Sequence, residues 1–588
     1  MKPLEVVKQY HAQTKHDFNR YARALGYMDW ANQPDPFRRY AGAPFYELPL
    51  LTAGDEPVAP PYASLFASQP VPSQPLTLNS LSRFFEYSLS ITAWKEYGGN
   101  RWALRSNPSS GNLHPTEGYL LVRETAGLPL KPGLYHYAPK EHGLEHRWHG
   151  STEAIDALLR PFPAQSFFVG LSSIHWREAW KYGERAFRYC QHDVGHALGT
   201  LRIAGAALGW RVFLLVGLDD RTVGAILGLN RLHEFERAEP EFPELLCVVC
   251  HAPTPPPLFF PPSEGGERGA SIPLVVDQAI VEHWEQGDWR GKANRLSRDN
   301  PVPWEIIDDV TKASWKTSTE SSRLRLPPPP PRAEQGQTEG ASPPNPRPDM
   351  ISAHRIIHQR RSAVAFDRKT SISAQQFFTM LERVMPHSNR PVAQRPVPWD
   401  SLSWDPTIHL ALFVHRVDGL LPGMYMLLRN DDPALKATFQ QAMHRQFAWT
   451  DPEHCPGSLP LYLLEDGNAQ RIAMQLSCHQ EIAGTGAFSL GMIAEFEASL
   501  EKHGPWFYKR LFWETGLIGQ VLYLEAEAAS VRSTGIGCFF DDPVHRVLGW
   551  YPDTQFQSLY HFTAGGAVED HRLTTLPPYD ELSRGRKS

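Results

Sequence analysis

Apolar residues recur along this chain with two periods, and each period predicts a different kind of element. Recurrence every three or four positions predicts helices over Val6–Leu25, Leu78–Tyr87, Gly195–Leu208, Ile272–Trp289, Trp304–Trp315 and Gly516–Ala529. Short, continuous apolar runs predict strands over Gly118–Arg123, Gly133–Ala138, His409–Val414 and Gly423–Leu427. Helices predominate, with short strands that do not alternate with them regularly, so the pattern predicts an α+β fold rather than a βαβ fold.

Proline-rich sequence separates two halves of the chain. The chain has 588 residues, and 53 of them are proline, which is nearly double the average usage. The tracts Pro253–Pro262 and Arg325–Arg332 are typical of extended polyproline II or disordered spacers. We therefore predict an N-terminal domain over residues 1–255, a linker over 256–349 and a C-terminal domain over 350–588.

The two halves carry similar residues at a constant separation of 321 positions, as from Gly195 to Gly516. In this register Lys181-Tyr-Gly183 corresponds to Lys502-His-Gly504, and Asp193-Val-Gly195 to Glu514-Thr-Gly516. A shared register suggests an internal duplication. Because oligomer interfaces are commonly two-fold, two tethered copies would pair as an intramolecular pseudo-dimer, and such a chain could be monomeric.

Composition and charge limit the classes of partner. The formal net charge is -6 and there is no basic tail, which argues against nucleic acid or an anionic membrane as the main partner. No apolar run approaches the roughly 20 residues of a membrane span, and the N-terminal sequence lacks the apolar core of a signal peptide. These features predict a cytoplasmic protein.

Neither cysteine nor histidine spacing predicts a metal site. Six cysteines are too few for a disulfide scaffold. Cys247 and Cys250 have CxxC spacing, but they lie in an apolar run that predicts a buried strand, on which positions i and i+3 face opposite ways. His192 and His196 share one face of a helix, but no third ligand accompanies them. We predict no metal, and a structural or cofactor-adjacent place for both histidines.

The polar motif Pro108-Ser-Ser-Gly-Asn112 is the main candidate for a binding site. Pro108 fixes the local turn and Gly111 keeps the backbone accessible. Ser109, Ser110 and Asn112 offer hydroxyl and amide groups suited to the carbonyls and ring nitrogens of a flat heterocycle. Taken alone, the motif is more typical of an ordinary Asx or Ser turn, so its interpretation depends on the surrounding sequence.

With the rest of the chain, this motif resembles the nitroreductase superfamily and, more narrowly, the SagB/ThcOx-type dehydrogenases. The resemblance covers parts of both halves and rests on Leu81–Ile91, Arg105–Glu117, Lys181–Arg188, Arg360–Asp367, Trp513–Gln520 and Thr534–Asp542. It implies tandem nitroreductase-like domains with FMN bound between them.

The resemblance also implies which residues hold the flavin. Arg360, Arg361 and Ser362 match the element that grips the phosphate, and guanidinium and hydroxyl groups suit that role. An element that reaches the same flavin from the opposite unit is matched by Arg105, Pro108, Ser109, Ser110 and Asn112. The loop whose backbone approaches the flavin ring is matched by Gly535, Ile536 and Gly537.

These motifs are divided between the two halves in a complementary way. The first half has the serine motif, but Pro60–Phe66 and Gly209–Val212 stand where the arginine and glycine motifs would be. The second half has both of those, with the proline-rich Met385–Trp404 in place of the serine motif. We therefore expect one composite flavin site and a second site that has decayed.

For the reaction, the resemblance implies an FMN-dependent oxidoreductase in which hydride leaves a substrate for the flavin. Lys181 and Tyr182 match the pair thought to take the substrate proton, although they also fit a surface lysine beside a packed tyrosine. The expected substrate is a small molecule or a modified peptide whose azoline is oxidised to an azole. Two alternatives stay open, an NAD(P)H-dependent nitro or quinone reductase and a flavin-less scaffold in a biosynthetic complex.

Overall fold

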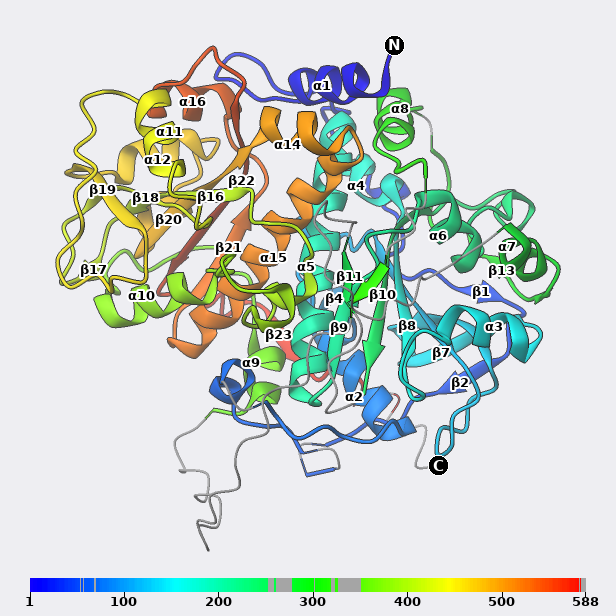
Figure 1. Ribbon diagram of the computed structural model, residues 1–588. Coiled ribbons are helices and arrows are strands. Elements are labelled where there is room, and N and C mark those ends of the chain that lie inside the picture. Colours follow the sequence, from blue (N-terminus) through cyan, green and yellow to red (C-terminus); the bar gives the residue numbers. More distant parts are fainter. Residues whose placement is uncertain are drawn as a thin grey trace, which may run out of the picture.

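Two antiparallel sheets, one from each half of the chain, lie on either side of a central pair of long helices (Figure 1). The computed structural model describes residues 1–52, 54–55, 58–67, 70–251, 258–260, 278–300, 302–318, 323–325, 351–580 and 582. Most of both proline tracts lies outside these residues. The mixed architecture confirms the predicted α+β class, although the sheets are more extensive than the apolar runs suggested.

The sheet of the first half has the order β12-β7-β6-β5-β8-β10-β9, with β2 also paired to β7. Its strands are β2 (Phe45–Glu47), β5 (Thr116–Val122), β6 (Gly133–Ala138), β7 (Gly143–His149), β8 (Phe167–Ser173), β9 (Arg211–Leu214), β10 (Phe242–Cys250) and β12 (Asp288–Trp289). Cys247 and Cys250 lie on β10 and are buried, as the apolar run predicted.

The sheet of the second half has the order β19-β18-β16-β20-β22-β21. Its strands are β16 (Ile408–Val414), β18 (Gly423–Leu427), β19 (Leu461–Asp466), β20 (Phe488–Glu495), β21 (Arg532–Ile536) and β22 (Phe556–Gly565). Central strands such as β16 are buried at every position because helices and loops cover both faces. This burial explains why they read as continuous apolar runs and not as alternating ones.

Most of the predicted helices are present. Leu78–Tyr87 is confirmed by α2 (Leu78–Ser88), and Trp304–Trp315 by α8 (Glu305–Ala313). The predicted helix Ile272–Trp289 is present only in part, as α7 (Gln278–Glu285). Its end forms the strand β12 instead, and residues 272–277 lie outside the described part. In α7, Trp284 stacks on Trp148 at 3.8 Å between ring centroids, so this part of the predicted linker packs on the first sheet.

The predicted helix Val6–Leu25 is wrong beyond its first half. The observed α1 spans Pro3–Gln13. After it the chain turns, because the backbone N–H of His16 donates to Asp541 Oδ2 at 2.9 Å. That acceptor lies 525 positions away in sequence, so the local pattern of apolar residues could not predict where the helix ends.

The duplication predicted from the sequence register is confirmed element by element. Three helices of the first half, α4 (His175–Tyr182), α5 (Ala186–Ala207) and α6 (Asp220–Leu227), recur in the second as α14 (Phe496–His503), α15 (Phe507–Ala528) and α16 (Asp541–Leu548). Both ends of every pair differ by 321 positions, as from 186 to 507 and from 207 to 528. The halves therefore form the predicted intramolecular pseudo-dimer.

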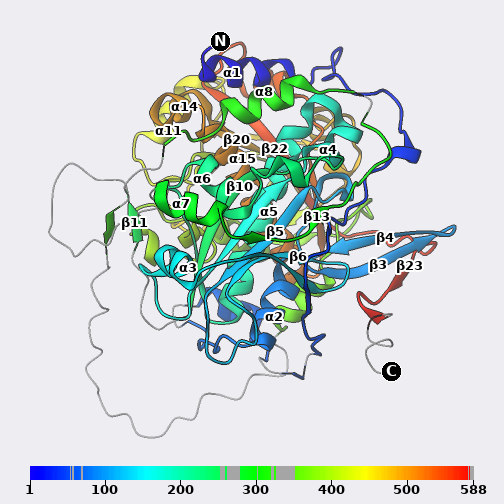
Figure 2. The same ribbon diagram turned by 90° about the vertical axis from the view of Figure 1, so that its right-hand side faces the viewer.

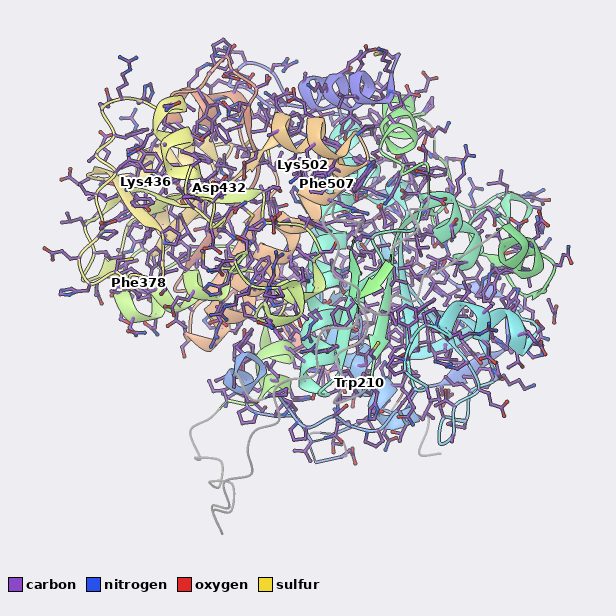
Figure 3. The ribbon with its side chains drawn as sticks, viewed as in Figure 1. Trp210, Phe378, Asp432, Lys436, Lys502 and Phe507 are labelled. Atoms are coloured by element: carbon purple, nitrogen blue, oxygen red, sulfur yellow. The ribbon has the colours of Figure 1, made fainter. Side chains whose placement is uncertain are left out.

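The central helices α5 and α15 touch where two equivalent glycines meet. A Cβ on Gly195 would lie 2.3 Å from the carbonyl oxygen of Trp513, and one on Gly516 would lie 2.2 Å from that of His192. Figure 3 labels Phe507 at the start of α15 and Trp210 beyond the end of α5, and the two helices run the same way. Only glycine allows the two backbones to approach this closely.

The halves also exchange segments at their edges. Strand β23 (Thr574–Leu576), near the end of the chain, pairs with β3 (Ile91–Tyr97), which pairs in turn with β4 (Asn100–Arg105) (Figure 2). At the other end of the chain, His11 in α1 contacts Gln557 Oε1 of the second half at 3.1 Å. Among the described residues, no helix combines the length and apolar character needed to cross a membrane.

The glycine crossing makes a prediction about stability. Gly195→Ala should destabilise the protein by about 1–3 kcal/mol, because the added methyl group overlaps backbone that cannot move freely. The control is Gly457→Ala, since a Cβ there would meet nothing within 4 Å and should change stability little. Thermal unfolding of the three proteins measures the difference, and equal midpoints for both variants would contradict the proposed close packing.

Candidate functional site

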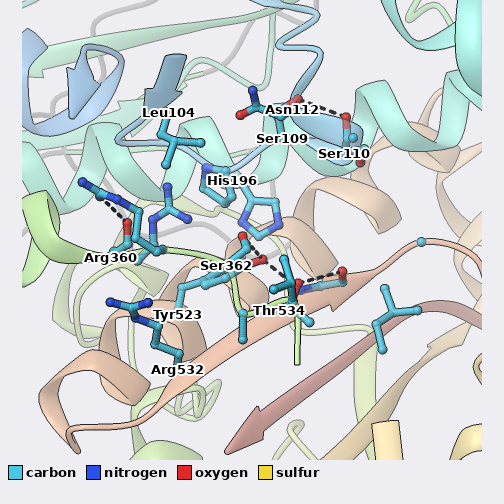
Figure 4. A pocket seen from close by; sticks show the side chains of 18 of the residues that line it. Leu104, Ser109, Ser110, Asn112, His196, Arg360, Ser362, Tyr523, Arg532 and Thr534 are labelled. Atoms are coloured by element: carbon cyan, nitrogen blue, oxygen red, sulfur yellow. Dashed lines mark hydrogen bonds between the residues drawn. The ribbon is translucent and has the colours of Figure 1, made fainter. Parts of the chain in front are cut away.

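A cavity of about 480 Å³ opens between the two halves, within the usual size range of small-molecule sites. Its lining includes Arg105, Pro108–Asn112, Arg360–Ser362, Gly535–Gly537 and Tyr182. Three motifs that lie hundreds of positions apart in sequence therefore border one space, together with a member of the predicted catalytic pair. Figure 4 shows the serine motif on one side of this cavity and Arg360 and Arg532 on another.

The serine motif uses its polar groups mainly to hold its own shape. Ser109 Oγ accepts from the backbone N–H of His114 at 2.8 Å, and Asn112 Nδ2 donates to the carbonyl of Ala103 at 2.9 Å. Gly111, Asn112 and His114 all have positive φ, between 50° and 60°, so these bonds maintain a tightly wound loop. Ser109, Ser110 and Asn112 also line the cavity, and their contact with a ligand stays a prediction.

Asp193, on α5, holds the serine motif in place through hydrogen bonds. Its carboxylate accepts from both the backbone N–H and the hydroxyl of Ser110, each at 3.1 Å. The side chain is buried and lines the cavity. Burial raises the pKa of Asp193 to about 7, and the bonds from Ser109 and Ser110 oppose that rise. A carboxyl group that titrates near neutral pH can donate or accept a proton at the cavity wall.

Two adjacent arginines supply positive charge at the other side. Arg360 is 4% exposed, its Nη2 donates to the carbonyl of Arg105 at 2.6 Å, and its Nε has no partner. Arg361 Nη1 donates to the carbonyls of His358 and Arg360, both at 2.7 Å. Burial and the charge of Arg360 lower the pKa of Arg361 to about 10, so it stays protonated at neutral pH.

Among the described residues, these guanidinium groups bond to carbonyl and hydroxyl oxygens and not to carboxylates. The nearby carboxylate of Glu527 accepts the backbone N–H of Arg361 instead, at 3.1 Å. Arg360 is buried and the adjacent Arg361 is half-buried, and two such cations side by side repel each other and are costly without an anion. Because guanidinium groups pair well with phosphate oxygens, this side of the cavity is suited to an anionic ligand group.

Arg105 lines the cavity, and its guanidinium group also bonds within the first half. Its side chain is buried, stacks over Phe37, and donates to the carbonyl of Pro36 at 2.5 Å. Its role at the cavity is through its own carbonyl, which receives the bond from Arg360. Arg105 therefore positions a predicted phosphate-binding residue.

The glycine loop at the end of β21 is packed against tyrosines. A Cβ on Gly535 would lie 1.9 Å from Tyr560 Oη, and one on Gly537 would lie 2.0 Å from a ring carbon of Tyr189. The N–H of Gly535 already donates to Tyr523 Oη at 2.9 Å, and the same hydroxyl bonds Ser362 at 3.0 Å. Glycine is thus required at both positions for the loop to lie on the aromatic wall of the cavity.

Lys181 and Tyr182 lie at the tip of the serine motif. A Cβ on Gly111 would be 2.7 Å from Tyr182 Oη and 3.1 Å from Lys181 Nζ. Lys181 is exposed, whereas Tyr182 is half-buried and stacks at 4.2 Å on Tyr189. Burial raises the pKa of Tyr182 well above its usual range. The pair therefore extends from the exposed surface, at Lys181, to the cavity wall, at Tyr182.

Sequence reasoning missed several cavity residues, including Asp193, Tyr189, Tyr523 and Tyr560. They have no motif of their own, and only the duplicated register drew attention to Asp193. His196, expected to be structural or cofactor-adjacent, lines the cavity, and burial lowers its pKa to about 3, so it is neutral.

Neither histidine of the i, i+4 pair is arranged for a metal. His192 Nδ1 bonds Thr515 Oγ1 at 2.8 Å, and His196 Nε2 bonds Tyr560 Oη at 3.2 Å. Within the described residues, Glu86, His354 and His358 bring potential ligand atoms within 4.8 Å of one another. Arg83 donates to Glu86 at 2.7 Å, and its positive charge works against a cation there.

The position related to the cavity by the duplication is filled with buried ion pairs. Arg202, 321 positions before Tyr523, makes two 2.8 Å bonds to Asp400, and both side chains are buried. Glu514, the counterpart of Asp193, accepts from Arg429 at 2.7 Å. Asp400 lies in Met385–Trp404 and Arg202 bonds the carbonyl of Trp210, so the two segments that lack binding motifs meet each other here.

The raised pKa of Asp193 predicts a pH effect on stability. The folded protein holds this proton up to about pH 7, whereas an unfolded aspartate releases it near pH 4. The resulting stabilisation is present below about pH 4 and is lost as the pH rises through 7. Because asparagine does not titrate, the thermal midpoint of wild type should fall relative to that of Asp193→Asn as the pH rises from 4 to 8. A constant difference contradicts this, and Glu453→Gln, an exposed carboxyl, is the control.

Known proteins resemble this chain in sequence and in fold. The chain is 28% identical over 181 residues to “Putative nitroreductase MJ1384” of Methanocaldococcus jannaschii, covering 30% of this chain and 82% of that protein. A solved structure from Anabaena variabilis, described as a putative nitroreductase, matches 96% of this chain and 99% of its own with a TM-score of 0.60 and 21% identity. No family model matches the chain.

A chain of the Escherichia coli microcin synthetase McbBCD complex also aligns, over 42% of this chain and 93% of its own, at 16% identity and a TM-score of 0.26. That score is too low to support a conclusion about function. The Anabaena structure shows that the tandem architecture as a whole is shared, from one end of the chain to the other. The similar sequence and the shared fold relate this chain to proteins described as putative nitroreductases.

Proposed function

We propose that this chain is an FMN-dependent oxidoreductase with one flavin site, formed jointly by its two halves. The observation that carries the proposal is the pair of adjacent arginines, Arg360 buried and Arg361 half-buried, at a cavity that also receives the serine motif of the other half. Arg360, Arg361 and Ser362 would hold the phosphate, and the serine motif and the glycine loop would border the ring. Bound FMN would supply a two-electron acceptor for hydride.

A single site per chain is supported by what fills the related position. The Arg202–Asp400 pair is buried and doubly bonded. Removing one partner would leave an uncompensated buried charge, which is strongly unfavourable. A second flavin would have to displace this pair, whereas the cavity at Arg360 has open volume.

Proton handling would fall to Lys181 and Tyr182. At the cavity wall, a Cβ on Gly111 would lie 3.1 Å from the Lys181 amine and 2.7 Å from the Tyr182 hydroxyl. Because Lys181 is exposed, a group presented on a long peptide could reach it from solvent. This favours a SagB/ThcOx-type reaction, in which an azoline of a modified peptide loses a proton to Lys181 and a hydride to the acceptor.

A second candidate is an NAD(P)H-dependent reductase of nitro compounds or quinones. It is favoured by the sequence similarity to a protein named as a nitroreductase. The two reactions differ in their donor, so NADPH oxidation with a quinone in the absence of peptide would favour the reductase. Oxygen-dependent oxidation of a thiazoline peptide would favour the dehydrogenase, and a colourless protein that binds no FMN would leave the scaffold reading.

The phosphate assignment is tested by comparing two flavins. Arg361→Gln should weaken FMN binding about 10- to 100-fold, since hydrogen bonds to charged groups contribute roughly 1.5–3 kcal/mol. Riboflavin, which has no phosphate, should bind the variant and the wild type equally. Arg355→Gln is the control because that side chain is exposed two turns earlier. Equal losses for FMN and riboflavin would remove the assignment.

The catalytic pair has a matched control in the duplication. Lys181→Ala should lower turnover of a thiazoline peptide by roughly 10²–10⁴-fold, the usual contribution of a general base, while the flavin absorbance is retained. Lys502→Ala changes the equivalent lysine of the second half, labelled in Figure 3, and should have no such effect. Full turnover in Lys181→Ala would exclude Lys181 as the base.

A further inference from the structure

Two cysteines from separate segments of the second half face each other at the cavity. Cys538, the residue after the glycine loop, lines the cavity, and its sulfur lies 2.8 Å from that of Cys478. Both are free and half-buried. A disulfide bond is about 2.05 Å long, so closing the bond needs an approach of less than about 1 Å.

Hydrogen bonds on both sides hold these segments together. Cys478 follows α12 (Gln470–Leu476) in a turn with φ of 53°. The backbone N–H of Phe540 donates to the carbonyl of Leu476 at 2.8 Å, and Gln480 Nε2 donates to the carbonyl of Cys538 at 3.0 Å. The pair therefore does not depend on a chance approach of two loops.

The surroundings of Cys538 favour its thiolate. His16 Nδ1 accepts from the backbone N–H of Ala22 at 2.9 Å, so the neutral ring carries its proton on Nε2, from where it can donate to the sulfur. The bond from Cys478, the bond from His16 and the charge of Arg185 lower the pKa of Cys538 to about 5. Its thiol partner, Cys478, has a raised pKa.

Other charged and titratable groups also lie near the two cysteines. Arg185 Nη2 donates to the carbonyl of Gly537 at 3.2 Å, and its Nη1 bonds Asp541 at 3.0 Å. Tyr189 and Tyr21 also lie near the sulfurs, and burial raises the pKa of both hydroxyls, which keeps them neutral.

The remaining cysteines have different settings. Cys190, Cys247 and Cys250 are buried, and burial raises the pKa of each. Cys455 is half-buried, and burial raises its pKa to about 11. Reactive thiols are accessible and ionised at neutral pH, and among the described cysteines this combination distinguishes Cys538.

We propose that Cys478 and Cys538 form a redox-active pair that exchanges electrons with a small disulfide entering the cavity. Cys538 is the attacking thiolate and Cys478 is the resolving thiol.

The two steps balance in atoms and electrons. The Cys538 thiolate attacks one sulfur of the small disulfide, so that a mixed disulfide forms and one thiolate leaves. Cys478 then loses its proton and attacks Cys538 Sγ, which forms the internal disulfide and releases the second thiolate. Starting from the Cys538 thiolate and the Cys478 thiol, the protein loses two electrons and one proton, and the small disulfide leaves as two thiolates, which take up protons from Cys478 and from water. The reverse sequence reduces the protein.

The experiment incubates the chain, as purified, with oxidised glutathione, counts free thiols after denaturation, and maps linked peptides by mass spectrometry. Wild type should fall from six free thiols to four, with one peptide joining Cys478 to Cys538. Cys478→Ser should stop at one glutathione on Cys538, and Cys455→Ser should still form the internal link. His16→Ala should slow glutathione addition to Cys538 several-fold.

Six free thiols in wild type after this treatment would overturn the proposal. A linked peptide joining other cysteines would also overturn it. Faster addition of glutathione to Cys478 in the Cys538→Ser variant than to Cys538 in the Cys478→Ser variant would overturn it as well. These readouts do not depend on flavin or turnover, so the proposal can fail while the proposed function stands, and the reverse.

Discussion

The contact of α5 with α15 at Gly195 and Gly516 is the constraint on which the rest of the structure depends. Two backbones can approach this closely only where neither residue carries a Cβ. The two glycines are equivalent in the duplicated register, so the contact is self-complementary, as two-fold interfaces are. It sets the spacing of the two halves along their longest helices.

That spacing creates one cavity and closes another. On one side Asp193 of α5 holds the serine motif of the first half opposite the arginines and glycine loop of the second. On the other side the equivalent positions, Arg202 and Glu514, are paired with Asp400 and Arg429. The cavity therefore has cationic and aromatic walls, whereas the related position holds two buried ion pairs.

Much of this arrangement could be predicted from the sequence because it is carried by local pattern or by register. The constant offset located both central helices and their glycines, and the division of motifs between the halves anticipated that they border one cavity. The strand Gly133–Ala138 was predicted to the residue because a buried strand is a continuous apolar run.

The rest depends on contacts between distant residues. The end of α1 is set by Asp541, far along the chain. The hydrogen bonds that hold the positive-φ loop of the serine motif, from Asn112 to Ala103 and from His114 to Ser109, could not be predicted from the sequence either. Asp193 could not be singled out, since one aspartate in a helix has no motif and its raised pKa comes entirely from burial by the fold.

The number of flavins per chain tests most directly whether the two halves form a single flavin site. The protein is saturated with FMN, freed of unbound flavin, and analysed for flavin by absorbance after denaturation and for protein by amino-acid analysis. We expect one FMN per chain. A ratio of two would show that the Arg202–Asp400 side also binds flavin, and a ratio of zero would show that the arginine-lined cavity serves another ligand.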